Sequence, residues 1–250
     1  MHRGYFSESV KTVAPPLRSV LARADTGPKP TMRARVHRRP GFTLLETMMA
    51  LVIIGVGVLA FVDAQTSFIR SNNWSSRAAT GMLLANEIRE MTRRLPRHDP
   101  VTGLSMVTVA GGATSLVGWG RETSETQIDD LDDLDDLDGL TFGVGGNFSG
   151  PVSAFGDLVK EIGLDGTVAV SGDGVSRGLE GWSQHVTIEK VDPYNFSTVR
   201  AKAYEQAATA QLPFIRVDQF PVRVTVVVNF QGPEDANLDQ VSKMTWIVIP

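Results

Sequence analysis

A run of mostly apolar residues from Phe42 to Val62 dominates the hydropathy pattern of the chain. A helix of this length spans roughly 30 Å, which is the thickness of one hydrocarbon core. The run is too long for the apolar region of a secretory signal, and Asp63-Ala64-Gln65 after it is a poor cleavage site. The pattern therefore predicts a membrane-spanning helix that the mature chain keeps.

The helical pattern continues beyond this run. Apolar side chains recur at helical spacing, with polar and basic side chains on the other faces, until Pro96 and Pro100 end the pattern. The apolar positions are Ala78, Met82, Ala85, Ile88, Met91 and Leu95. A single helix from Phe42 to about Leu95 would be roughly 80 Å long, apolar all round over 42–62 and amphipathic over 63–95.

Residues 96–250 show short β-branched runs separated by glycines, which predict a β-rich head. The strongest runs, Val222–Phe230 and Val241–Ile249, flank a polar Gly-Pro connection and predict an antiparallel hairpin. Residues 151–163 fit one short helix, and 197–211 fit another helix or a long loop. Weaker strands are expected at Met106–Val109, Leu140–Phe142, Thr167–Val170 and His185–Val191. The expected fold class is α+β, with a long N-terminal helix followed by a globular head that contains an antiparallel sheet.

The charge of the chain changes sign at the apolar run. Residues 1–41 carry nine Lys/Arg and two Asp/Glu, a net +7, and residues 42–250 carry fifteen and twenty-six, a net −11. Basic residues before an apolar helix stay in the cytoplasm, which places the acidic head on the other side of the membrane. An acidic body argues against nucleic acid as a partner. The absence of cysteine excludes disulfides, thiol nucleophiles and cysteine metal sites.

One carboxylate, Glu46, lies inside the apolar run. An acid at the centre of a membrane helix costs roughly 2.5–3.5 kcal/mol on insertion scales, so such a residue needs a partner. From the residues alone two interpretations are open: the side chain reaches the membrane surface near the end of an anchor, or it has a function.

The stretch from Gly41 to Glu46, GFTLLE, follows basic residues and precedes the apolar helix. It resembles the type III signal of type IV prepilins and type II secretion pseudopilins, and the likeness covers about residues 33–65. In that family a prepilin peptidase cuts after the glycine and methylates the new N-terminal residue. The resemblance implies a pilin-like fold, cleavage after Gly41 and methylation of Phe42. It also implies that Glu46 meets the Phe42 amine of a neighbouring subunit during assembly.

The resemblance further implies a filament subunit rather than an enzyme. Its partners would be prepilin peptidase, other pilin or pseudopilin subunits, an inner-membrane assembly platform and, before assembly, membrane lipid. The protein would span the inner membrane once, with its C-terminal head outside the cytoplasm, and would then enter a pilus or a periplasmic pseudopilus. The chain departs from the family in two ways. Many family helices carry a helix-breaking proline about twenty residues after the cleavage site, where this chain has Val62-Asp63, and many family heads end in a disulfide-bounded loop, which this chain cannot form without cysteine. Both departures argue against a dominant fibre subunit and fit a minor type IV pilin or a type II secretion pseudopilin. The minor type IV pilin is the expected function; the alternatives are the pseudopilin and a signal-anchored extracytoplasmic binding protein.

The stretch before this signal is longer than the resemblance requires. Met32 begins a ten-residue basic leader of ordinary length for the family. Translation is therefore expected to start at Met32, which leaves residues 1–31 untranslated or disordered.

Seven aspartates lie in ten residues between Asp129 and Asp138, in a three-residue repeat. Their repulsion disfavours an α-helix. The segment 129–139 is expected to be a solvated acidic loop or to bind Ca²⁺, which takes several carboxylate oxygens. The candidate ligands are Asp133, Asp135, Asp136 and Asp138. No other cofactor is expected.

Catalytic patterns are weak. Gly174 to Gly178 matches Gly-x-Ser-x-Gly, but further glycines surround Ser176, and the strand–turn–helix context of a nucleophile elbow is missing. The histidines show no metal-ligand spacing. The sequence therefore gives no support for an enzyme.

Overall fold

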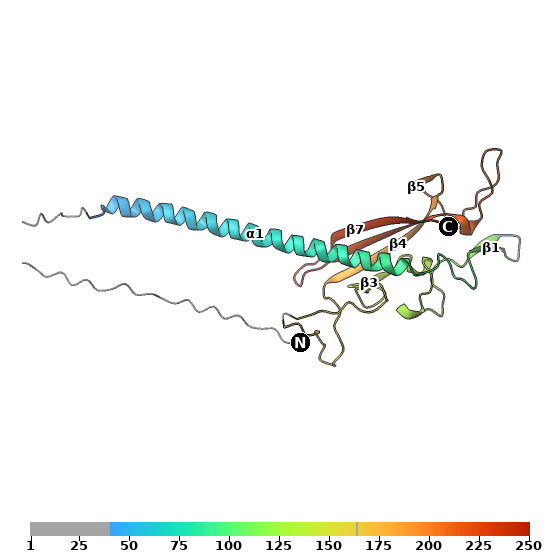
Figure 1. Cartoon of the computed structure of the whole chain (residues 1–250), viewed down its shortest axis with the longest axis horizontal. Helices are drawn as coiled ribbons and strands as arrows, with labels where there is room; N and C mark the ends of the chain where they lie inside the picture. Colours follow the sequence, from blue (N-terminus) through green and yellow to red (C-terminus); the bar gives the residue numbers. More distant parts are fainter. Residues whose placement is uncertain (1–40, 164) are drawn as a thin grey trace, which may run out of the picture. The chain divides into compact units, whose positions relative to one another are not determined.

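The computed structural model describes residues 41–163 and 165–250 (Figure 1). The expected leader up to residue 40 and the expected start at Met32 lie outside the described residues. The chain divides into a unit that ends at Gly55 and a larger unit that begins at Val56 and contains the head.

One α-helix, α1, runs from Leu44 to Thr92. No proline interrupts this stretch, so every turn keeps its backbone donor. Thr43 precedes the helix, and its Oγ1 accepts a hydrogen bond from the Glu46 N–H at 3.3 Å, as N-cap residues do. The long helix that the sequence predicts is confirmed, and it ends at Thr92 rather than at Leu95.

The head is built on an antiparallel sheet. Its neighbouring strands are β3 (Thr141–Gly143), β4 (Trp182–Asp192), β6 (Val222–Phe230) and β7 (Asp239–Val248), and β5 (Asn195–Val199) pairs with the end of β4. A separate hairpin joins β1 (Ser105–Thr108) to β2 (Thr114–Val117). The expected hairpin of β6 and β7 is confirmed. Burial alternates along β6, so a slip of one residue would expose its core face.

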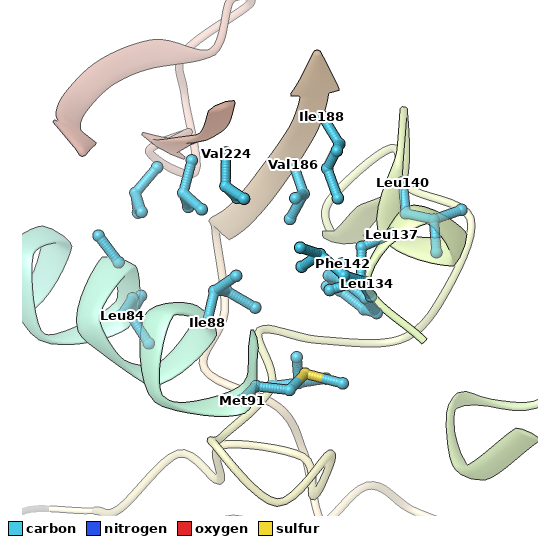
Figure 2. Packing of buried hydrophobic residues seen from close by; sticks show 14 of the residues in the cluster. Leu84, Ile88, Met91, Leu134, Leu137, Leu140, Phe142, Val186, Ile188 and Val224 are labelled. Carbon is cyan, nitrogen blue, oxygen red and sulfur yellow. The ribbon is translucent and has the colours of Figure 1, made fainter. Parts of the chain in front are cut away.

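The core lies between this sheet and the C-terminal part of α1, as Figures 1 and 2 show. Leu84, Ile88 and Met91 come from α1, and Val186, Ile188 and Val224 from the sheet. Gly81 allows the helix to approach β7 closely, because a Cβ there would lie 2.9 Å from Val241 Cγ1.

Residues 128–140 close the core from the side (Figure 2). They contain two short 3₁₀ helices, Ile128–Asp130 and Asp135–Leu137. Leu137 ends the second of these helices, Leu134 is its N-cap, and Leu131 is the C-cap of the first. Leu131, Leu134 and Leu137 are all buried. The expectation of a solvated acidic loop is therefore wrong, because the leucines draw the segment into the core.

The described residues of 151–181 form neither the short helix expected over 151–163 nor the strand expected over 167–170; they form turns and isolated bridges. In the turn from Ser153 to Asp157 the Ser153 N–H donates to the Asp157 carbonyl at 2.8 Å. Gly156 has φ +85°, a left-handed conformation that ends any helix. The turn Ser171–Val175 repeats this geometry, with Gly174 at φ +83°.

A ring of backbone hydrogen bonds joins the segments between these turns. Glu161 N–H donates to the Arg177 carbonyl at 3.0 Å, Ala169 N–H to the Glu161 carbonyl at 2.8 Å, and Arg177 N–H to the Ala169 carbonyl at 2.9 Å. Each residue of the ring thus gives one bond and receives one, which satisfies the backbone without a regular sheet. Of 197–211, the first residues belong to β5 and the rest form a loop.

Candidate functional site

The N-terminal end of α1 carries the residues that the sequence singles out. Gly41 lies just before the helix, and a Cβ added there would meet no atom within 4 Å. Phe42 is 80% exposed, and Glu46 lies in the first turn. The helix is long and apolar enough to cross a membrane, and its apolar window is not buried within the chain. This surface is unsuited to water and fits a hydrocarbon or a subunit interface.

The carboxylate of Glu46 makes no hydrogen bond or ion pair with any residue that the structure describes. Only its backbone N–H is engaged, by Thr43 at the N-cap. Thr43 and Glu46 have the spacing of a capping box, in which an acid or amide at this position reaches back to the cap. An acid in the first turn also suits the positive end of the helix dipole.

The four aspartates proposed as metal ligands do not form one group. His98 Nδ1 lies 2.7 Å from Asp135 Oδ2, and burial lowers the pKa of His98 to about 4, so a neutral ring donates this bond. Asp138 accepts from the Trp119 indole N–H at 3.2 Å and the Ile188 backbone N–H at 2.9 Å. The polar contacts of Asp135 and Asp138 thus fasten the segment to the rest of the head.

Asp133 and Asp136 belong to a different group, which includes two acids that sequence reasoning missed. Single carboxylate oxygens of Glu122, Glu125 and Asp136 lie within 4.8 Å of one another, and so do those of Asp132, Asp133 and Asp136. Asp136 belongs to both trios. The available signal for the glutamates was their spacing of three residues shortly before the aspartate repeat.

The electrostatics of this group are unfavourable for negative charge. Burial, together with Asp135, raises the pKa of Asp133 to about 8. Burial and the Asp133 charge raise the pKa of Asp136 to about 6. Burial also raises the pKa values of Glu122 and Glu125. A cation among these oxygens would favour their charged forms.

Ser176 is not arranged as a nucleophile. It pairs with Val170 in an isolated bridge beside the turn Ser171–Val175. A nucleophile elbow needs a helix directly after the serine, and the described residues that follow Ser176 run into β4.

Comparison with known families gives one match. The family model described as "Prokaryotic N-terminal methylation motif" fits residues 36–62. No curated protein and no solved structure matches the chain.

Proposed function

The chain belongs to the family of prepilin-type proteins that carry the prokaryotic N-terminal methylation motif, and from this premise we propose that it is a minor type IV pilin. The family consists of structural proteins, so the chain is a pilin- or pseudopilin-like subunit and not an enzyme. Its motif implies processing by prepilin peptidase and assembly with pilin subunits. Its single N-terminal apolar helix is consistent with an anchor in the inner membrane before assembly.

The observation that carries the proposal is the Glu46 carboxylate, which lies at the start of an exposed apolar helix and pairs with none of the described residues. Cleavage between Gly41 and Phe42 would create an amine on Phe42, whose reference pKa is about 7.7–8.0. N-methylation leaves this amine positive. In a filament core of low dielectric, an isolated ammonium and an isolated carboxylate are each costly, whereas a pair offsets much of that cost. Glu46 would therefore receive the Phe42 amine of a neighbouring subunit and fix the axial register of the helices.

The proposal separates processing from assembly. The peptidase acts on the monomer at the bond before Phe42, and Glu46 lies beyond this bond. Glu46→Gln and Glu46→Ala should therefore be cleaved normally but enter filaments poorly. Removing one partner of a buried ion pair costs roughly 3–5 kcal/mol, and 1.4 kcal/mol is tenfold in an equilibrium. The expected loss of incorporation is about two orders of magnitude or more.

The experiment compares sheared filaments and membranes from cells with an active prepilin peptidase. Asp63→Asn is the matched control, because Asp63 is an exposed carboxylate on the same helix. Glu46→Gln removes the negative charge but keeps the helix cap, since glutamine serves in a capping box as glutamate does. A defect of this variant therefore reports on the charge. Replacing Gly41 with leucine should block cleavage. Normal incorporation of both Glu46 variants would refute the assembly role, and a wild-type chain with an intact leader would refute the processing step.

A type II secretion pseudopilin is the second candidate. It is favoured by the same sequence departures, a stem without a helix-breaking proline and a chain without cysteine. The two candidates differ in where the chain is found. A minor pilin appears in sheared surface filaments, whereas a pseudopilin stays with the envelope and its deletion stops protein secretion.

A further inference from the structure

The side chain of Asp136 is buried but only half satisfied. The residue is 1% exposed. Its Oδ2 accepts hydrogen bonds from the backbone N–H groups of Asp132 and Asp133, both at 3.2 Å. Its Oδ1 is buried and has no hydrogen-bond partner among the described residues. Buried polar atoms are almost always paired, so such an oxygen points to a missing partner.

Glu122 and Glu125 face the same space from another segment. Glu125 is 8% exposed, and its Oε2 accepts the Glu122 backbone N–H at 2.8 Å. Glu122 Oε2 is buried and, like Asp136 Oδ1, has no partner in the described part of the chain. The two segments bring their carboxylates together, and each segment holds one buried oxygen without a partner among the described residues.

No lysine or arginine that the structure describes forms an ion pair with Glu122, Glu125, Asp132, Asp133 or Asp136; the ion pairs of the described part of the chain lie elsewhere. Buried charges in proteins are paired with opposite charges or coordinate metals. For oxygen ligands alone, the suitable metals are hard cations.

We propose that Glu122, Glu125 and Asp136 bind one divalent cation of the size of Ca²⁺, with Asp132 and Asp133 beside it. Calcium lies 2.3–2.6 Å from its oxygen ligands, so two oxygens on opposite sides of the ion are about 4.6–5.2 Å apart. Oxygens that lie within 4.8 Å of one another fit around one such ion. Water completes the shell on the side of Glu122, which is only half-buried.

The bound ion fastens one segment of the head to another. It connects the turn that holds Glu122 and Glu125 to the aspartate repeat, whose leucines are part of the core. Asp135 and Asp138 of the same repeat also contact the stretch just before Glu122, where the Gly120 N–H donates to Asp135 Oδ1 at 3.3 Å and the Trp119 indole N–H donates to Asp138 Oδ2 at 3.2 Å. Calcium binding therefore stabilises the folded head by mass action, since the site exists only when both segments are in place.

The test uses the full chain in detergent micelles after removal of divalent cations with a chelator. Titration with CaCl₂ in a calorimeter should show one saturable site per chain and weaker binding of MgCl₂. The double variant Glu122→Gln, Glu125→Gln should bind calcium at least about tenfold more weakly, because the affinity of such sites follows the charge count of the ligands. Asp136→Asn removes the ligand that both trios share and should also weaken calcium binding. If this change of a buried residue prevents folding, the double glutamine variant still tests the site.

Asp129→Asn is the matched control. Asp129 belongs to the same repeat but is exposed and lies outside both trios. Calcium binding unchanged by Asp129→Asn and weakened by the glutamine pair supports the site. The proposal is overturned if no saturable binding occurs up to about 10 mM calcium, if the glutamine pair binds as the wild type does, or if Asp129→Asn weakens binding equally. The last two results would show that diffuse negative charge attracts the ion.

Discussion

Truncating Leu137 to alanine tests whether the aspartate-rich segment is part of the core. Leu137 is 0% exposed and packs in the cluster shared by α1 and the sheet. The substitution removes three carbon atoms, and burial of each contributes about 0.8 kcal/mol, so the transfer loss alone is about 2.4 kcal/mol. The cavity adds to this loss, and measured Leu→Ala series in other cores span roughly 2.7–5.0 kcal/mol. The expected destabilisation of Leu137→Ala is about 3–4 kcal/mol.

The assay is thermal unfolding of the full chain in micelles, followed by near-ultraviolet circular dichroism at a fixed calcium concentration. For a domain of 150–250 residues, each kcal/mol lowers the melting temperature by roughly 2–4 °C. The unit beginning at Val56 is of this size, so Leu137→Ala should melt about 6–16 °C below the wild type.

Leu238→Ala is the matched control, because it removes the same three carbon atoms from a residue that is 44% exposed and lies outside the core. It should destabilise the head by less than about 1 kcal/mol. If Leu137→Ala melts within the same small range as Leu238→Ala, the repeat is a solvated loop and the packing described above is refuted.

Two further predictions concern buried polar groups in β4. Gln184→Leu should destabilise the head by about 1–3 kcal/mol in urea unfolding, because Gln184 accepts from the Val152 N–H at 2.8 Å and donates to the Leu84 carbonyl at 2.8 Å; an unchanged midpoint would mean that neither group needs this partner. Burial lowers the pKa of Lys190 from 10.5 in the unfolded chain to about 8 in the folded head, although the negative charges of Glu205, Asp218 and Asp135 act in the opposite direction. The unfolded chain then binds more protons between these values, so stability rises with pH from about 8 to 10.5. Lys190→Gln should lose this rise, and equal slopes in both proteins would contradict it.

The long helix and the last hairpin could be predicted from sequence because single strong patterns determine them. The apolar run before Val62 and the missing prolines leave few alternatives to a helix. β6 alternates between a buried and a half-buried face, and its valines favour a strand. By contrast, β2 and β5 are short and mostly exposed, so no hydrophobic pattern marks them.

The aspartate repeat shows why the rest could not be predicted. The repulsion between its aspartates predicts a solvated loop, but the period of three also repeats a leucine, and these leucines are buried. Hydrogen bonds from distant partners, His98 before the segment and Ile188 far after it, hold the aspartates beside the buried leucines. Sequence separation conceals these partners. The same holds for Glu122 and Asp136, which meet only because the chain reverses between them. In residues 151–163, Gly156 overrides a composition that fits a helix.

The turn Ser171–Val175 gives experimenters a place to label the protein. Its tip residues Gly172 and Asp173 are exposed, and a Cβ added at Gly172 would meet no atom within 4 Å. Exposed turn tips with small polar residues tolerate inserted sequence better than other sites do. A short epitope placed after Gly172 would extend into solvent, because the hydrogen bond from the Ser171 N–H to the Val175 carbonyl closes the turn below the insertion point. An antibody against that epitope could then show by electron microscopy whether single copies of this protein lie along sheared filaments, with α1 left unaltered.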